Sequence, residues 1–158
     1  MIFMRKVLLL FLLVGVIGCK KDNFTTEPQI SFVKFDRNTG SNLDVASNPP
    51  HIILEVTDKE GDLGFIPGSD TAKIYMKNLL TNRVDSSLTF PDLGTSAKKN
   101  FKGEVSISLF DIMGGRDLPV SQRPYTDTLF FEIYIKDFAK NKSNVIVTDQ
   151  PFIYHTLP

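Results

Sequence analysis

Hydrophobic and polar residues alternate along most of the chain after residue 28. This period of two is typical of β-strands that bury one face. The clearest runs cover residues 51–57, 71–78, 104–110 and 128–136. The last run has the strongest pattern, and its apolar face carries Leu129, Phe131, Ile133 and Ile135. The pattern therefore predicts an all-β domain.

Weaker alternation predicts further strands at residues 29–35, 83–90, 143–148 and 151–154, separated by turn-forming residues. In the first of these, one face is expected to carry Ile30, Phe32 and Lys34, and the other Ser31, Val33 and Phe35. Seven or eight strands at this spacing predict an antiparallel β-sandwich like that of immunoglobulin or fibronectin type III domains, over residues 29–158.

The first 18 residues have a different pattern. Arg5 and Lys6 precede an apolar run, Val7–Ile17, that only Gly15 interrupts. A positive start followed by a short apolar core is typical of a secretory signal, which is removed from the mature protein. The run is well short of the roughly 20 residues that a membrane-spanning helix needs. We therefore expect residues 1–18 to be a helical signal peptide.

The end of this core, Val16-Ile17-Gly18-Cys19, resembles the lipobox of bacterial lipoproteins. The resemblance implies cleavage before Cys19, a diacylglycerol group on its sulfur and an acyl chain on the new amino terminus. Cys19 is the only cysteine, so an internal disulfide is not available to it. Several acyl chains together hold a protein firmly to a membrane, whereas one chain binds weakly. The alternative is an uncleaved anchor with an incidental cysteine.

Residues 19–28 are predicted to be a flexible tether between the acylated cysteine and the domain, because they are polar and end at Pro28. The stretch Lys20-Lys21-Asp22 has no acidic residue directly after Cys19. It resembles the signal that exports lipoproteins of some bacteria to the outer face of the outer membrane. The resemblance implies an outer-membrane location and favours the cell surface.

Composition narrows the classes of function. Removing 18 of the 158 residues leaves 140, enough for one domain with a proper core. The mature chain has two more acidic than basic residues, which gives no indication of nucleic-acid binding. His51 and His155, the only histidines, are far apart, and the sequence shows no nucleophile–base motif or metal triad. We therefore expect no enzymatic activity.

Acidic residues cluster in the loop Asp58–Gly64, which reads DKEGDLG. Asp58, Glu60 and Asp62 stand at alternate positions, so an extended loop places their carboxylates on one side, as in oxygen-rich sites for hard cations. The loop does not follow the EF-hand template, because Leu63 and Ser69 stand where that template has Gly and Glu.

A second polar stretch, Asp137–Asn144, reads DFAKNKSN and follows the strongest strand. In an immunoglobulin-like sandwich this stretch, the acidic loop and the start of the first strand share one end of the domain. Two interpretations follow. In the first, a Ca²⁺ ion is bound by Asp58, Glu60, Asp62 and Asp137, with carbonyl oxygens completing the shell. In the second, the acids are solvated and the turns are formed by Gly61, Gly64, Asn141 and Asn144.

The two stretches together resemble those of small immunoglobulin-like outer-membrane lipoproteins, whose loops read roughly D-G-D-G-D-L-G and D-R-A-G-N-x-S-N. This chain departs at Glu60, where Asp is usual, and at Lys140, where Gly is usual. Glu60 still offers oxygen. Lys140 places a non-glycine residue where a left-handed turn conformation is expected, and a cation near any metal. The resemblance implies fold and location and carries no activity.

The function that these observations favour is that of a non-catalytic, lipid-anchored interaction or accessory module of the cell envelope. Its exposed sheet face or long loops would contact an unidentified protein or glycan. The alternatives are a purely structural envelope component and a glycan-binding, adhesin-like module.

Overall fold

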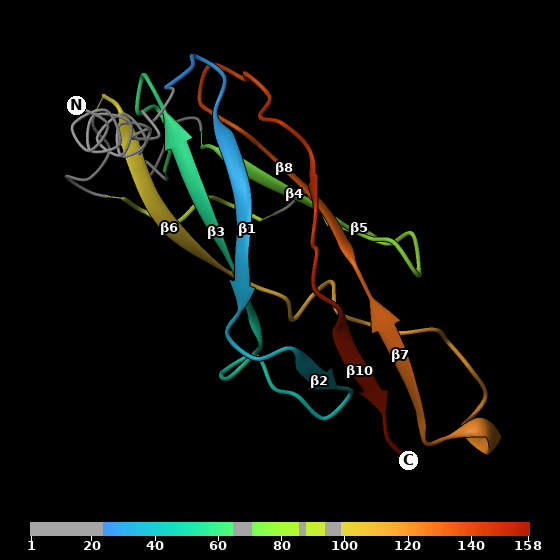
Figure 1. Cartoon of the computed structure of the whole chain (residues 1–158). Coiled ribbons are helices and arrows are strands. Elements are labelled where there is room, and N and C mark those ends of the chain that lie inside the picture. Colours follow the sequence, from blue (N-terminus) through green and yellow to red (C-terminus); the bar gives the residue numbers. More distant parts are fainter. Residues whose placement is uncertain (1–23, 65–70, 86–87, 94–98) are drawn as a thin grey trace, which may run out of the picture.

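Figure 1 shows the computed structural model of the chain, which describes residues 24–64, 71–85, 88–93 and 99–158. The predicted signal peptide, Cys19 and residues 20–23 of the tether lie outside the described residues. The described part consists of strands and loops with one short 3₁₀-helix, η2 (Val120–Gln122). Among these residues, no helix has the length and apolar character needed to cross a membrane. The prediction of an all-β domain is confirmed.

The strands form three sheets. The first, in the order β1-β3-β6, is antiparallel and consists of β1 (Gln29–Phe35), β3 (His51–Asp58) and β6 (Phe101–Ser108). The second, in the order β5-β4-β8-β9, is antiparallel and consists of β5 (Val84–Asp85), β4 (Lys73–Asn78), β8 (Phe131–Lys136) and β9 (Ile146–Val147). The third has the order β2-β10-β7 and consists of β2 (Thr39–Ser41), β10 (Phe152–Thr156) and β7 (Tyr125–Leu129). In this sheet β2 runs parallel to β10 and β7 antiparallel to it.

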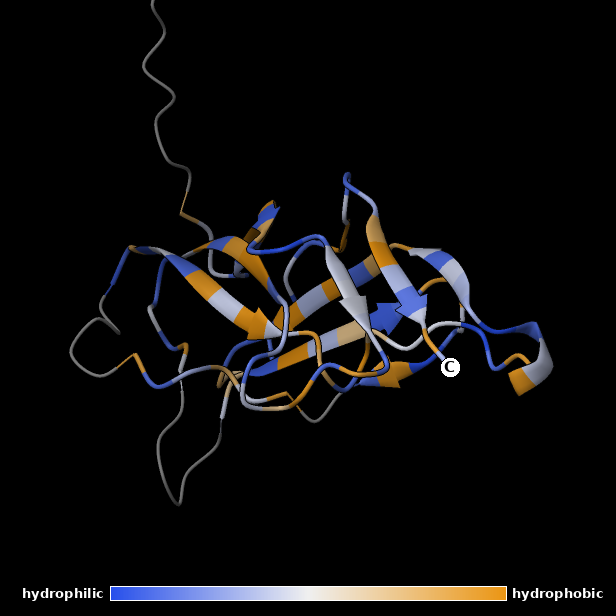
Figure 2. Ribbon diagram, turned by 90° about the horizontal axis from the view of Figure 1, so that it is seen from below, coloured by the Kyte–Doolittle hydropathy of each residue, from blue (hydrophilic) through white to orange (hydrophobic). Residues whose placement is uncertain are grey.

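The inward faces of the strands form one hydrophobic core. Along β3 every second side chain is fully buried, beginning at Ile52, and the same holds along β8 from Phe131. Figure 2 shows this alternation as orange segments between pale or blue ones on the strands. Each of the apolar side chains among them contributes about 1.5–3 kcal/mol through its burial. The period seen in the sequence is therefore the period of the core.

Three aromatic rings join the three sheets at the centre of the molecule. Phe35 of β1 lies with its ring centroid 6.3 Å from that of Phe131 of β8 and 5.4 Å from that of Phe152 of β10. The rings of Phe131 and Phe152 are 6.1 Å apart, and all three pairs have the edge-to-face geometry that aromatic rings prefer.

The strongest predicted strand, residues 128–136, is two strands in the structure. Its predicted core face is confirmed, since Leu129, Phe131, Ile133 and Ile135 are all fully buried. The chain changes partner in the middle of this run: Leu129 pairs with Phe152 of β10, whereas Phe131 pairs with Asn78 of β4. Alternation in a sequence reports which face is buried and does not report which strand is the neighbour.

The predicted faces of the first strand are wrong after Phe32. The register of β1 against β3 shifts between Phe32 and Lys34, so one extra residue lies in β1. Such a bulge moves the following side chains to the opposite face. Phe35 is consequently buried and Lys34 is exposed, the reverse of the expected arrangement.

Two further strands lie where the sequence predicts loops. β2 occupies the turn-rich stretch after β1, and β7 begins at Tyr125, inside the predicted loop 114–127. Gly40 of β2 has to be glycine, because a Cβ there would lie 2.9 Å from the ring of Phe152. Of the predicted strand at 83–90, residues 86–87 lie outside the described residues, and the described ones contain the two residues of β5 and an isolated bridge between Thr89 and Lys73.

Candidate metal centre

Asp58 is the last residue of β3, and its position in the strand explains its burial. Ile52, Leu54 and Val56 point into the core, so the next inward position after them is Asp58. Its side chain is fully buried. A carboxylate in such a place is costly to ionise unless charge or hydrogen bonds compensate for the lost water.

The turn after β3 supplies one such hydrogen bond. Gly61 has a φ of 69°, in the left-handed region that favours glycine, and its N–H donates to Oδ2 of Asp58. The turn brings Asp62 against the residues that follow β8: the Asp62 carbonyl accepts from the N–H of Phe138 at 3.0 Å, and its Oδ2 accepts from the N–H of Ala139 at 3.3 Å.

Asp137 directly follows β8 and is also fully buried. Its Oδ1 accepts the backbone N–H of Asn141 at 2.7 Å, and its Oδ2 accepts the side-chain amide of the same residue at 2.8 Å. Between them Lys140 has a φ of 69°. The sequence-based expectation of a left-handed residue at position 140 is thus confirmed.

These three aspartates meet in space. Asp58, Asp62 and Asp137 each offer one carboxylate oxygen to a group whose atoms all lie within 4.8 Å of one another. Oδ1 of Asp58 and Oδ1 of Asp62 are both buried and have no hydrogen-bond partner. Glu60, the fourth predicted ligand, lies outside this group: its residue is exposed, and its Oε1 accepts from Oγ1 of Thr26 at 3.3 Å.

Crowding of the carboxylates changes their proton affinities. Burial raises the pKa of Asp58 to about 6, and the charges of Asp62, Asp137 and Glu60 act in the same direction against the Gly61 hydrogen bond. Burial likewise raises the pKa of Asp137, with Asp62 adding to the effect and the hydrogen bonds from Asn141 opposing it. The cluster therefore favours a bound positive charge.

The predicted turn residues have distinct contacts. Gly61 and Gly64 have φ values of 69° and 117°, and Asn141 closes its turn through Asp137. Asn144 instead joins the segment before β9 to β1: its Oδ1 accepts from the N–H of Ile30 at 2.8 Å, and its Nδ2 donates to the Ile30 carbonyl at 2.9 Å. The turns and the carboxylate cluster occur together, so one does not exclude the other.

The beginning of the described chain lies beside the acidic loop. The N–H of Lys59 donates to the carbonyl of Thr25 at 3.1 Å, and Thr26 binds Glu60 as described above. We call residues 24–28 the leading segment. It enters the domain at the end that carries the cluster, as the sequence predicts for the first strand.

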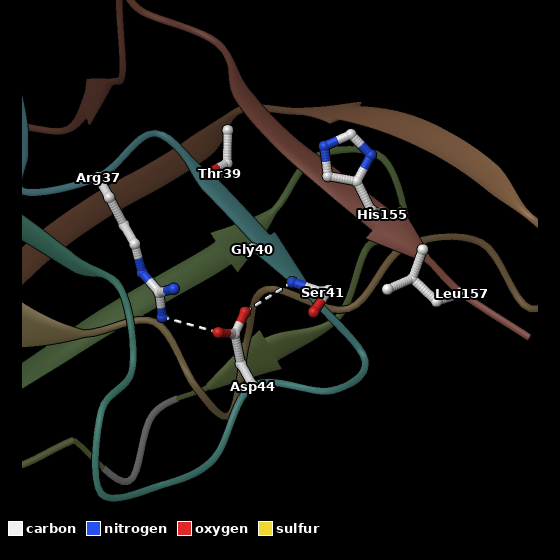
Figure 3. Close-up of a pocket in the computed structure, with 7 residues that line it drawn as sticks. All are labelled: Arg37, Thr39, Gly40, Ser41, Asp44, His155 and Leu157. Carbon is white, nitrogen blue, oxygen red and sulfur yellow. Dashed lines mark hydrogen bonds and ion pairs between the residues drawn. The ribbon is translucent and has the colours of Figure 1, made fainter.

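A polar hollow lies at the other end of β1 (Figure 3). It has a volume of about 280 Å³ and is lined by Arg37, Thr39, Gly40, Ser41, Asp44, His155 and Leu157. Asp44 holds two other lining residues in place: its Oδ1 accepts from Nη2 of Arg37 at 2.8 Å, and its Oδ2 accepts from the N–H of Ser41. Sequence reasoning missed this hollow, because its residues come from a turn-rich stretch and the last strand and form no motif.

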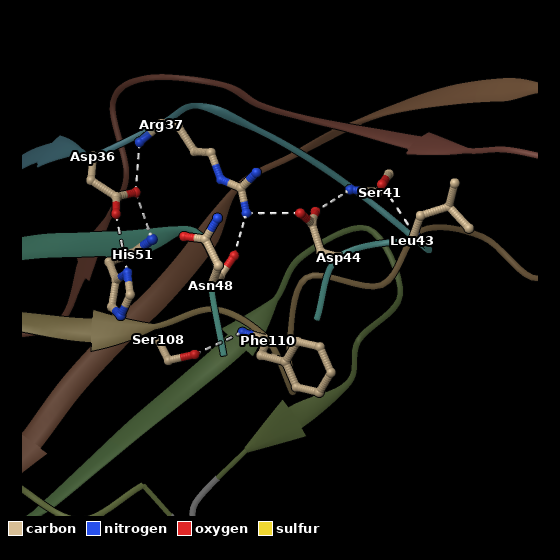
Figure 4. Close-up of polar contacts among 9 residues, drawn as sticks. All are labelled: Asp36, Arg37, Ser41, Leu43, Asp44, Asn48, His51, Ser108 and Phe110. Carbon is tan, nitrogen blue, oxygen red and sulfur yellow. Dashed lines mark hydrogen bonds and ion pairs between the residues drawn. The ribbon is translucent and has the colours of Figure 1, made fainter. Parts of the chain in front are cut away.

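The same end of the molecule holds a histidine–carboxylate pair (Figure 4). Nδ1 of His51 lies 3.0 Å from Oδ2 of Asp36, as in the base of many hydrolases. Ser108 pairs with His51 across the strands, but its Oγ accepts the N–H of Phe110 at 3.2 Å, and no hydrogen bond joins Ser108 to His51. The three residues thus do not form a nucleophile–base relay.

The chain matches no protein-family model, no curated protein and no solved structure.

Proposed function

We propose that this chain is a non-catalytic, lipid-anchored protein of the bacterial cell envelope that contacts a partner with the end of the domain opposite its anchor. The anchor rests on the sequence: a short signal-like leader, the lipobox-like residues Val16-Ile17-Gly18-Cys19 and the absence of any other cysteine. Fatty chains on Cys19 would hold the protein in the outer membrane, with the cell surface as the favoured face.

The observation that carries the orientation is the position of the leading segment. Cys19 and Phe24 are five positions apart, so an extended chain between them spans at most roughly 18 Å. Thr25 is hydrogen-bonded beside the acidic cluster, and β1 then runs its seven residues, roughly 20 Å, to the hollow. A short anchor would keep the acidic end near the lipid and direct the hollow away from it.

The chemistry of the hollow supports a polar partner. Hydroxyl groups of Thr39 and Ser41, the guanidinium of Arg37 and the imidazole of His155 line it. Its volume is close to the lower limit of about 300 Å³ for small-molecule pockets, which suits a single sugar unit or one side chain of a protein partner. The proposal therefore includes an unidentified protein or glycan as the partner.

The sheet order supports an immunoglobulin-like arrangement as part of this proposal. Strands β1, β3 and β6 are neighbours in the way that strands A, B and E are in that fold, and β4, β8 and β9 correspond to C, F and G. The sheet of β2, β10 and β7 has no counterpart in this correspondence and would extend the domain at the end of the hollow.

The anchor is tested by replacing its sulfur. We expect radiolabelled palmitate to enter the wild-type protein and the protein to sediment with membranes, whereas Cys19→Ser takes up no label and loses its leader slowly. Mass spectrometry of cell-derived protein that still carries residues 1–18, or a bare thiol at Cys19, would overturn the anchor.

Contact through the hollow is tested by pull-down from outer membranes and by a glycan array. Arg37→Gln removes a lining cation and should weaken capture at least fivefold, whereas Lys34→Gln changes an exposed cation of β1 that does not line the hollow and should bind as the wild type. Equal capture by Arg37→Gln and wild type would exclude the hollow, and capture by neither protein would favour a purely structural role.

A further inference from the structure

We propose that Asp58, Asp62 and Asp137 bind one Ca²⁺ ion, which joins the loop after β3 to the residues after β8. The inference does not depend on the lipid anchor or on a partner, so it survives if the proposed function fails. The sequence alone leaves this cluster undecided between a cation site and solvated acids.

The first argument is the burial of unpartnered oxygen. Oδ1 of Asp58 is buried and has no hydrogen-bond donor beside it, and the same is true of Oδ1 of Asp62. Buried polar atoms almost always have a partner, and a buried carboxylate oxygen without one is costly. A cation bound by these carboxylates would supply the missing partner.

The second argument is the geometry of the three acids. Oxygens of Asp58, Asp62 and Asp137 lie within 4.8 Å of one another, which is about twice the Ca²⁺–oxygen distance of 2.3–2.6 Å. One ion can therefore touch all three. Both oxygens of Asp137 accept hydrogen bonds from Asn141, and each retains a second lone pair for a metal.

The donor set selects the metal. The group offers carboxylate oxygens only and has no histidine or cysteine, so it lacks the nitrogen and sulfur ligands that zinc and copper prefer. Ca²⁺ accepts irregular sets of six to eight oxygens, and carbonyl groups and water would complete its shell. Glu60 is directed to Thr26 and is not a ligand in this arrangement.

The ion would also hold the leading segment. Lys59, which donates to the Thr25 carbonyl, lies between two of the ligands, and Phe138 and Ala139 donate to Asp62 beside the third. Fixing residues 58 and 62 on one ion fixes the backbone between them. Ca²⁺ would thus stabilise the point at which the chain from the anchor joins the domain.

The test is calorimetric titration of CaCl₂ into the full-length protein in detergent, after removal of metal with EGTA. We expect one Ca²⁺ per chain, a rise in melting temperature of about 5–10 °C at saturation, and slower hydrogen exchange at the N–H groups of Lys59, Phe138 and Ala139. Millimolar Ca²⁺ that gives neither heat nor a change in melting temperature would overturn the proposal.

Asp62→Asn is the matching variant. It should weaken Ca²⁺ binding at least tenfold, and it should fold, because it removes a charge from a crowded cluster. Asp149→Asn changes an exposed acid outside the cluster and should bind as the wild type. Undiminished Ca²⁺ affinity in Asp62→Asn would overturn the assignment of the ligands.

Discussion

At the scale of single residues, two tendencies of Asp58 oppose each other. Its place in the alternation of β3 directs its side chain inward, and its charge favours water. The Gly61 N–H satisfies one oxygen and leaves the other without a hydrogen bond. A proton or a cation has to resolve what remains, and the two compete for the same oxygens.

The metal-free protein should therefore lose stability as the pH rises. The pKa of Asp58 is about 6 in the folded protein and 3.8 ordinarily, so the folded state holds this proton more tightly than the unfolded chain. The contribution of protonated Asp58 to the free energy of unfolding is fully present below about pH 4 and is lost as the pH rises through 6. We expect the free energy of unfolding in chelator to fall by about 2–3 kcal/mol from this group between pH 4 and pH 7.

The comparison with Asp58→Asn isolates this group from the other acids. The amide has nearly the same shape and does not titrate, so the variant should lack this part of the slope in urea unfolding measured from pH 4 to pH 7. Parallel curves for wild type and Asp58→Asn would contradict the assignment.

At the scale of elements, the turn between β8 and β9 combines a fixed shape with an unfavourable residue. Asp137 holds both the backbone and the side chain of Asn141, and this closure imposes the left-handed conformation of Lys140. Such a conformation costs an L-residue other than glycine roughly 1–2 kcal/mol. The hydrogen bonds to Asp137 and the pairing of β8 with β4 and β9 offset that cost.

Lys140→Gly should stabilise the protein for this reason. Lys140→Ala is its matched control, because alanine loses the same side-chain contacts and charge but keeps the Cβ. We expect the free energy of unfolding of the glycine variant to be about 1 kcal/mol higher than that of the alanine variant. The difference is smaller than the full conformational cost because glycine has greater freedom in the unfolded chain. Thermal unfolding in chelator measures the difference, and an equal or lower stability of the glycine variant would contradict it.

At the scale of the whole molecule, a few contacts between segments far apart in the sequence hold the sheets together. The rings of Phe35, Phe131 and Phe152 connect all three sheets in the core. At the end with the acidic cluster, Asn144 binds both backbone groups of Ile30 and so connects β1 to the segment before β9. These contacts determine which loops lie together at each end.

Asn144→Ala should weaken that connection. It leaves the N–H and the carbonyl of Ile30 without their partner beside a buried side chain, and we expect a loss of about 1–2 kcal/mol in the free energy of unfolding. Asn48→Ala is the control: Asn48 is exposed and accepts from Arg37 through its backbone carbonyl, which the substitution retains. Equal urea unfolding curves for the two variants would show that the Asn144 bridge contributes nothing.

Local patterns predicted what depends on neighbours in sequence. The buried face of residues 129–135 and the strand over residues 51–57, which the structure extends by one residue to Asp58, follow from alternation. The left-handed conformation at Lys140 was implied by the resemblance to lipoproteins that have Gly at this position. The bulge in β1, the change of partner after Leu129 and the strand β2 did not follow, because each is decided by a strand far away in the chain.

The amino-acid sequence by itself determined that the domain is built of strands and that acidic residues follow two of them. Only the tertiary structure decided which acids meet. Asp62 and Glu60 are two residues apart in one loop, yet Asp62 accepts a hydrogen bond from Ala139 and Glu60 accepts one from Thr26. The physical reason is that a side chain in a loop takes its direction from contacts with remote segments, whereas in a strand the pleat itself provides that direction.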